Sequence, residues 1–495
     1  MGIKTRFNPM GGRASDGPDY GDLADWRYST TEIVGKTLLY NYTGSDWANT
    51  IYVPKDKKRA IINNWQSSSS SGSTEANRNT PFYNNLNVIN VDLQNVPFRN
   101  NNMYNAFYNC QNLIEVKNIN SNTIDMTNTF YNCKRLQLNV VLPNSVTNMS
   151  GTFWNCYSFN QNIHIPNSVT NMALTFFYCM RLNQNIQIPN GVTDVYSTFW
   201  NCTGLNQSIQ IPESATNMAM TFINCYALNS PITMLSTTGN LYRTFYQCNN
   251  LNQSIKLPSG TVTNLHETFL NCFNLNAPIT MPASCPSDMV NTFYRCINLN
   301  QNIQIPTDVT NMYGTFSMCN TLNQNIQIPS TVTNMAFTFN SCKTLNQNIK
   351  IPSSVKDLSH AFYYCSTLNQ NIQIPTGVQN LVSTFEYCNS LNQSIQVPNT
   401  VTNIARAFYA LGAMKGVRIN ILSTEITNAN MFFSSNNTGR KNVYIYFRYA
   451  NNILTKTYNT FKSSPWYYAN GSTGSTNILT NRRNCYIYNL GKAPW

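Results

Sequence analysis

The sequence predicts a repeat solenoid, in which short coils of chain stack on one another to form a rod. Phenylalanine recurs at a nearly fixed spacing from Phe107 to Phe408, and a cysteine stands three residues after nearly every one of them, from Cys110 to Cys388. The step is 23 residues throughout, apart from two steps of 24 between Cys248 and Cys296. A unit of this length cannot bury its apolar face alone, so a fixed period indicates coils that pack against their neighbours.

Each unit has the same internal order, seen clearly after Cys179. Leucine follows the cysteine at position +3, isoleucine at +7 and +9, proline at +10, valine at +13, methionine or leucine at +16 and phenylalanine at +20. The alternation of Ile186 and Ile188 predicts a short strand with both side chains inward, which Pro189 ends. The valine, methionine, phenylalanine and next cysteine follow helical spacing, which predicts a helical turn on the opposite wall. Together these features predict a coil of short β-strands and helical turns, repeated along a solenoid.

Asparagine recurs at the two corners of the unit, in Thr-Asn before methionine and in Asn-Gln after leucine. Asparagine side chains bond to backbone groups in turns. We therefore expect these residues to hold the corners and to form ladders from coil to coil.

Four segments are predicted from the boundaries of the repeat. Residues 1–66 form an attachment segment, either a small, mostly β unit or an extended arm, and residues 67–82 form a serine-rich linker. Residues 83–440 form the solenoid, with an atypical first coil as its N-terminal cap. Residues 441–495 form a β-rich, basic and aromatic C-terminal cap.

Composition restricts the possible classes of protein. Only 10% of the residues are charged, but the periodic apolar positions argue against disorder. Residues 405–495 hold eleven of the lysines and arginines against a single acid, Glu425. No run of apolar residues is long enough for a transmembrane helix, so we expect no membrane insertion, and the N-terminus has no secretory signal pattern.

The cysteines are predicted to be buried free thiols. Thirteen of the fifteen stand at one phase of the repeat, where parallel side chains point into a core and rarely reach disulfide geometry. Free thiols indicate folding in a reducing compartment. The paired spacings of a zinc site do not occur, so no metal is expected.

No pattern in the sequence indicates an enzyme. His164, His266 and His360 stand at unrelated phases of the repeat, and few acids lie near them in the sequence. A catalytic base needs a partner within hydrogen-bond reach, and the motifs of phosphate loops and nucleophile elbows do not occur. The chain is therefore predicted to be non-enzymatic and to need no cofactor.

Two repeated rows are candidate binding surfaces. Position +8, between the inward isoleucines, is mostly glutamine, and this row either bonds a glycan or partner strand or is simply a soluble face. The residue after the core phenylalanine is often aromatic, which predicts an edge for docking a sugar or protein, or else packing between coils or subunits. The candidate ligand-binding residues in this second row are Trp154, Trp200, Tyr246, Tyr294 and Tyr363.

The basic C-terminal end supplies two further candidates, Arg482 and Arg483. Basic residues among aromatic ones can cap the solenoid and form an interface between subunits, which makes a homo-oligomer possible. They can also bind an anionic surface polymer, whereas nucleic acid is the least favoured partner.

The repeat resembles the BspA-like class of bacterial leucine-rich repeats, whose units follow AFxxCxxLxxIxIPxxVxxI, over about 300 residues. The half-unit Val-Thr-Asn-Met-x-x-Thr-Phe-x-x-Cys-x-x-Leu-Asn-Gln also resembles a sister repeat of lipoproteins from wall-less bacteria. This chain has one extra residue between Leu and Ile, and one fewer between Met and Phe. Such repeats imply a right-handed coil of the leucine-rich-repeat kind. They also imply surface recognition, by bacterial adhesins or by structural and host-binding proteins of bacteriophages.

The leading prediction is a structural protein of a bacteriophage virion, of the tail-fibre, baseplate or head-decoration type. Its N-terminal sequence MGIKTRFNPMGG and its C-terminal segments are similar to the ends of tailed-phage proteins. Residues 1–66 would bind other virion proteins, and the solenoid would recognise a glycan or protein on the host surface, with assembly in the host cytoplasm. The alternatives are a bacterial cell-surface or secreted adhesin, and a virion decoration without a ligand.

Overall fold

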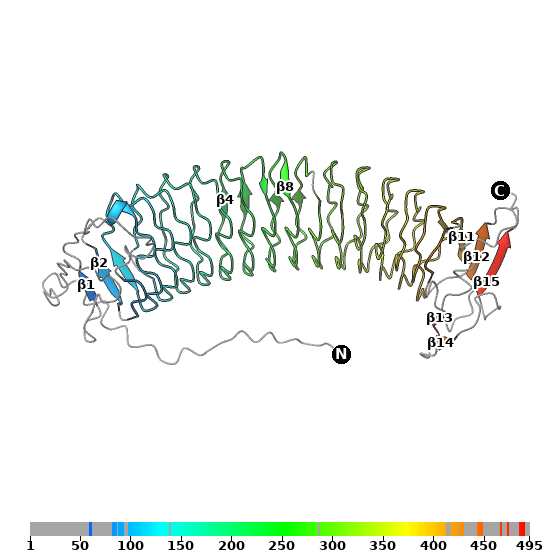
Figure 1. Cartoon of the computed structure of the whole chain (residues 1–495), viewed down its shortest axis with the longest axis horizontal. Helices are drawn as coiled ribbons and strands as arrows, with labels where there is room; N and C mark the ends of the chain where they lie inside the picture. Colours follow the sequence, from blue (N-terminus) through cyan, green and yellow to red (C-terminus); the bar gives the residue numbers. More distant parts are fainter. Residues whose placement is uncertain are drawn as a thin grey trace, which may run out of the picture.

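The protein was analysed as a computed structural model, in which the coils form one curved row. The structure describes residues 59–61, 82–86, 88–93, 98–137, 140–285, 288–411, 417–423 and 425–429, and the strands at 443–448, 466–467, 473–474 and 485–490. The stacked coils bend into an arc (Figure 1). The predicted solenoid is confirmed. No helix in the described part has the length and apolar composition needed to cross a membrane.

Short strands mark the coils near both ends and in the middle of the row (Figure 1). One parallel sheet joins β1 (Arg59–Ile61), β2 (Asn90–Asp92) and β3 (Glu115–Lys117). Parallel pairs then join β4 (Ile209–Ile211) to β5 (Ile232–Met234), β6 (Gly239–Asn240) to β8 (Val262–Asn264), and β7 (Ile255–Lys256) to β9 (Ile279–Thr280). The last parallel sheet has the order β10 (Ile395–Val397), β11 (Val417–Ile421), β12 (Val443–Arg448), β15 (Cys485–Leu490). The antiparallel pair is β13 (Trp466–Tyr467) with β14 (Thr473–Gly474).

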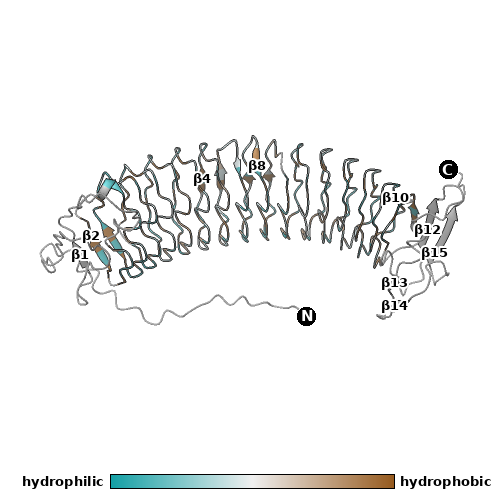
Figure 2. Ribbon diagram, viewed as in Figure 1, coloured by the Kyte–Doolittle hydropathy of each residue, from teal (hydrophilic) through white to brown (hydrophobic). Residues whose placement is uncertain are grey.

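The side of each coil that carries the Ile-x-Ile pattern, which we name the strand wall, follows the prediction. In β4 the side chains of Ile209 and Ile211 are buried, while Gln210 between them is exposed. Coils without a regular strand keep this alternation, as at residues 186–188. Apolar and polar residues therefore alternate along the coils, and the apolar ones share a single core (Figure 2).

The prediction of a helical turn on the opposite side is wrong. Among the described residues the structure has no α-helix, and its one helical element is the 3-10 turn η1 (Arg99–Asn101). Residues 149–156 instead make consecutive tight turns, with left-handed φ angles of 61° at Gly151 and 58° at Asn155. A right-handed helix cannot include such residues. The side formed by residues 149–156 and their equivalents is named the turn wall.

Hydrogen bonds on the turn wall alternate between two kinds of partner. The amide of Thr152 closes a turn by donating to the Met149 carbonyl of its own coil, at 3.0 Å. The amide of Phe153 donates to the Thr175 carbonyl of the next coil, at 2.8 Å. Gly151 likewise bonds the next coil, through the Ala173 carbonyl at 2.9 Å. The turn wall is thus a backbone ladder between coils, although it contains almost no regular strand.

A column of phenylalanine rings fills the interior behind the turn wall. Neighbouring core rings have centroids 5.3 Å apart at Phe245 and Phe269 and 5.7 Å apart at Phe176 and Phe199, and they are close to parallel. Phe82, the last residue of the predicted linker, is the first described ring of this column and lies 4.8 Å from Phe107. Stacking of buried aromatic rings therefore runs along the whole described solenoid.

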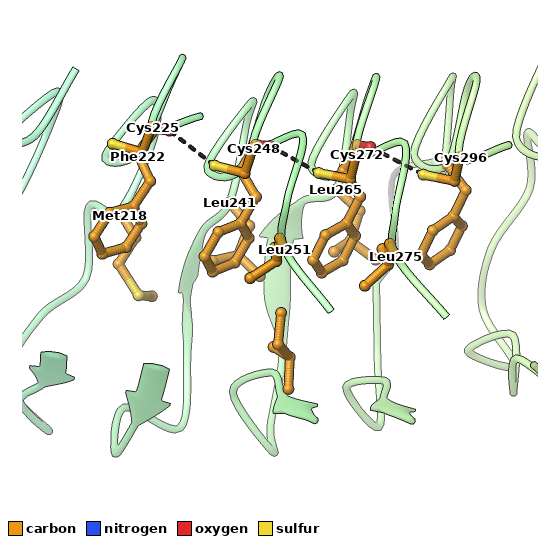
Figure 3. Close-up of a cluster of buried hydrophobic side chains, with 14 of the residues drawn as sticks. Met218, Phe222, Cys225, Leu241, Cys248, Leu251, Leu265, Cys272, Leu275 and Cys296 are labelled. Carbon is orange, nitrogen blue, oxygen red and sulfur yellow. Dashed lines mark hydrogen bonds between the residues drawn. The ribbon is translucent and has the colours of Figure 1, made fainter. Parts of the chain in front are cut away.

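Two rows of buried side chains donate to carbonyls that also accept the turn-closing amides of the turn wall. The hydroxyl of Thr175 donates to the carbonyls of Met172, at 2.7 Å, and Met149 in the preceding coil, at 3.0 Å. The thiol of Cys179 donates to the carbonyl of Phe153 in the preceding coil, at 3.1 Å. Figure 3 shows the equivalent thiol bonds in the middle of the solenoid. Each of these carbonyls therefore has at least two donors, and the buried hydroxyl and thiol groups find their own partners inside the core.

The fourteen cysteines whose side chains the structure describes are buried and form no disulfide, which confirms the predicted state of the thiols. Burial raises the pKa of the Cys110 thiol from 9.0 to about 12, and it also raises the pKa of Cys225. Desolvation disfavours the thiolate in both cases. The thiols are therefore protonated and shielded in the folded protein.

The raised thiol pKa values predict that stability falls in alkaline solution. Folded Cys110 keeps its proton over a pH range in which an unfolded thiol loses it, because its pKa rises from 9.0 to about 12 on folding. The stabilisation is complete below pH 9.0 and is lost progressively as the pH rises toward 12. Urea unfolding at a series of pH values measures this slope, and the variant Cys225→Ala should reduce it. An unchanged slope in that variant would contradict the assignment to thiols.

Candidate binding surface

Aromatic side chains gather on the turn wall in two places, and the first is a continuous stack. The N-terminal aromatic stack consists of Tyr83, Tyr108, Tyr131, Trp154, Phe177 and Trp200. Tyr108 and Tyr131 are 4.4 Å apart and almost parallel, while Trp154 is tilted against Phe177 at 4.5 Å. The rings thus cover one another between coils, which is the packing alternative considered for this row. Binding of a ligand by Trp154 and Trp200 stays a prediction.

The aromatic row is interrupted after Trp200, because Ile223 occupies the next equivalent position. Tyr246 lies beyond this gap and contacts the guanidinium of Arg243, 5.4 Å from its ring centroid. Arg243 Nε in turn donates to Glu267 Oε2 of the next coil, at 2.6 Å. Tyr246 therefore belongs to a separate polar group.

Tyr294 is also half-buried and lies two coils beyond Tyr246. Its neighbour Arg295 places a guanidinium 5.3 Å from the ring centroid of Phe273. The structure thus does not bring the five predicted aromatic residues into one site.

The second group of aromatic side chains, the C-terminal tyrosine cluster, differs from the stack in the angles between its rings. It consists of Tyr363, Tyr364, Tyr387 and Tyr409, around the ion pair of Glu386 and Arg406. Tyr387 lies at its centre and meets Tyr363 at 84°, Tyr364 at 61° and Tyr409 at 88°, with centroids 5.7 to 6.2 Å apart. These rings meet edge to face rather than in a parallel stack.

The ion pair holds this cluster together. Glu386 is only 1% exposed and accepts two bonds from Arg406, one of them from Nε at 2.9 Å. The guanidinium also lies 4.2 Å from the ring centroid of Tyr409. Its hydrogen bond to Glu386 raises the pKa of Arg406. A bidentate pair of this kind fixes the relative position of two coils.

Tyr363 is the one residue of this cluster that the repeat pattern predicted. The sequence does contain a signal for this cluster, because Glu386 follows the core Phe385 at the position that aromatic residues occupy in many other coils. Its partner Arg406 stands at a different phase and 20 residues away, so the repeat spacing does not connect them. The predicted residues Arg482 and Arg483 lie outside the described residues, as does all of 1–66 except β1.

The three histidines do not form a common site. His164 is exposed on the strand wall, whereas His266 contacts Asp288 on the turn wall. His360 stacks on Phe337 at 4.3 Å, and burial lowers its pKa. In the described ranges no three His, Cys, Asp or Glu side chains come together as a metal site would require. The absence of catalysis stays a prediction.

Amides on the strand wall and its corner bond mainly to one another. Gln187 Nε2 donates to Asn185 Oδ1 of the same coil, at 3.0 Å. At the corner, Asn183 Oδ1 accepts from the Asn206 amide at 2.9 Å and from Gln207 Nε2 at 3.2 Å, both in the next coil. This confirms the predicted ladder from coil to coil. The amide ladder therefore lies at the corner, whereas strand-wall glutamines such as Gln187 and Gln373 bond within their own coil.

Loss of the buried carboxylate should destabilise the last coils. The variant Glu386→Gln leaves the Arg406 guanidinium without its charged partner, so we expect the free energy of unfolding to fall by about 2–3 kcal/mol. Urea unfolding measures the change.

Glu267→Gln is the matched control, because it breaks the pair of Glu267 with Arg243, in which both side chains are more exposed. The control should lose less than about 1 kcal/mol. Equal losses in the two variants would show that the Glu386 pair does not have the assigned structural role.

Comparison with known proteins identifies the repeats. The profile of the BspA type leucine rich repeat region matches residues 65–160 and 102–229. The profile described as Mycoplasma protein of unknown function, DUF285, matches residues 188–281, 239–351, 287–397 and 351–444. The second set of matches spans 188–444, just over half of the chain. No curated protein matches the chain.

Two solved structures are similar to this chain, each at 20% sequence identity. One is a leucine rich cell surface protein from Faecalibacterium prausnitzii A2-165, with a TM-score of 0.37 over 73% of this chain and 88% of that one. The other is a leucine-rich repeat protein from Bacteroides ovatus ATCC 8483, with a TM-score of 0.44 over 77% of this chain and 88% of that one. From the profile matches, the chain belongs to the family described as Mycoplasma protein of unknown function, DUF285, and its repeats are of the BspA leucine-rich type.

Proposed function

We propose that the chain is a cell-surface repeat protein with an adhesin-like role, and that it binds its ligand on the turn wall. This was the alternative to the virion interpretation. The match to BspA-type repeats supports it, because repeats of this type imply surface recognition. The family profiles give no support to a virion origin, which stays a prediction together with the tail-fibre role.

The observation that carries the proposal is the unequal distribution of side chains between the two walls. The strand wall exposes a row of neutral amides, some of which bond a neighbouring amide, as Gln187 does with Asn185. The turn wall carries the N-terminal aromatic stack and the C-terminal tyrosine cluster. It also carries the ion pairs of Arg243 with Glu267 and of Arg406 with Glu386. Aromatic residues and arginine are the side chains most enriched at binding surfaces.

The two ends of the chain have roles other than ligand binding in this proposal. Residues 1–66 serve as the attachment segment, and the basic C-terminal end serves as a cap and possible interface between subunits. The solenoid between them needs no cofactor and catalyses no reaction, and its length keeps the turn wall accessible to a host glycan or protein.

Binding of the labelled, purified chain to bacterial and epithelial cells tests the proposal. We expect saturable binding that a turn-wall variant, Tyr83→Ser with Tyr246→Ser and Tyr364→Ser, weakens by about tenfold or more. A strand-wall variant, Gln187→Ser with Gln210→Ser, should bind as the unchanged chain does. Thermal unfolding of both variants shows whether each is folded.

Two results would contradict this function. One is the absence of saturable binding to every cell type tested. The other is a loss of binding in the strand-wall variant while the folded turn-wall variant still binds.

A further inference from the structure

We propose that the C-terminal tyrosine cluster is a binding site for an uncharged glycan. This inference rests on the proposed adhesin-like function, and it specifies the ligand and the coils that hold it. Three features of the cluster carry it: the orientation of the rings, the planar polar group among them and the small local charge.

Ring orientation distinguishes this cluster from the N-terminal aromatic stack. In the stack, parallel rings such as Tyr108 and Tyr131 cover each other's faces, and the later rings are tilted by 45° to 51° with centroids only 4.5 to 5.3 Å apart. In the cluster, Tyr364 meets Tyr387 at 61° and is 39% exposed, so the rings do not close into a continuous stack. The apolar C–H face of a sugar ring packs against the face of an aromatic ring, whose negative charge attracts the C–H groups. The cluster therefore presents the surface that a sugar needs.

A planar polar group lies next to these rings. The guanidinium of Arg406 is held by Glu386 on one side and by the ring of Tyr409 on another, yet its side chain is 32% exposed. Because the carboxylate is buried and the guanidinium is partly exposed, Glu386 fixes Arg406 in a plane from which N–H donors can reach sugar hydroxyls. Apolar surface with a few fixed polar groups is the usual composition of a ligand site.

Charge favours an uncharged ligand over an anionic one. Arg406 and Glu386 cancel, and the lowered pKa of His360 keeps that side chain neutral near pH 7. Among the residues whose side chains the structure describes, two further charges contact the cluster: Asp357, which faces His360, and Lys343, whose amine lies 5.8 Å from the Tyr364 ring centroid. These two charges also cancel. An anionic polymer would require an excess of positive charge.

Binding of the full chain to immobilised oligosaccharides tests the site. The probes are uncharged oligosaccharides with hexose, N-acetylhexosamine or fucose ends, alongside sialylated and uronic-acid oligosaccharides. We expect retention on at least one uncharged probe, with affinity about tenfold lower for Tyr364→Ala. Tyr364→Phe keeps the ring and should bind within about threefold of the unchanged chain.

Tyr226→Ala is the matched control, because Tyr226 is 40% exposed and lies outside the cluster. This variant should bind as the unchanged chain does. The site is rejected if no uncharged probe is retained, if only anionic probes bind, or if Tyr226→Ala loses as much affinity as Tyr364→Ala.

The outcomes for the site and for the proposed function are separable. If cells bind the chain and the turn-wall variant loses that binding while no uncharged oligosaccharide is retained, the glycan site is wrong and the adhesin-like function stands. A protein ligand would give that result. If neither cells nor oligosaccharides bind, both proposals fail.

Discussion

Each coil of this protein must bond its backbone to the next coil along the entire rod, and the rest of the structure depends on this constraint. Coils stacked by backbone bonds repeat about every 4.8 Å. The core phenylalanine rings, with centroids 5.3 to 5.7 Å apart over most of the column, stack at nearly this repeat. On the turn wall, left-handed residues such as Asn155 let one amide close a turn while the next bonds the neighbouring coil. Buried threonine and cysteine side chains then donate to the carbonyls that close these turns, from the following coil.

This construction separates the residues that build the rod from those that can vary. An interior row repeats nearly the same residue, because each member must fit between two equivalent neighbours. An outer row has no such restriction, so a substitution there changes the surface without changing the coil. Glu386 is an example, since it follows a core phenylalanine where Trp154 and Trp200 stand in earlier coils. The variable positions of the turn wall are therefore where binding specificity can arise.

The sequence predicted the features that depend only on the period: the stacked coils, the inward isoleucines, the buried thiols and the amide ladder. It could not distinguish a helix from consecutive turns, because valine, methionine, phenylalanine and cysteine at helical spacing fit both. Asparagine two residues after the core phenylalanine, as at Asn109 and Asn132, was the signal for left-handed turns. The sequence also could not give the angle between neighbouring rings, which separates the N-terminal aromatic stack from the C-terminal tyrosine cluster.

Hydrogen–deuterium exchange of the intact chain tests most directly whether the turn wall is a backbone ladder that fixes its surface side chains. Amides that bond the next coil should be slow to exchange, so peptides covering residues 149–156 should be protected as well as those covering β4. Protection should be similar in the equivalent peptides of the coils that carry the tyrosine cluster. Rapid exchange across the turn wall, with protection limited to the strand wall, would contradict the account.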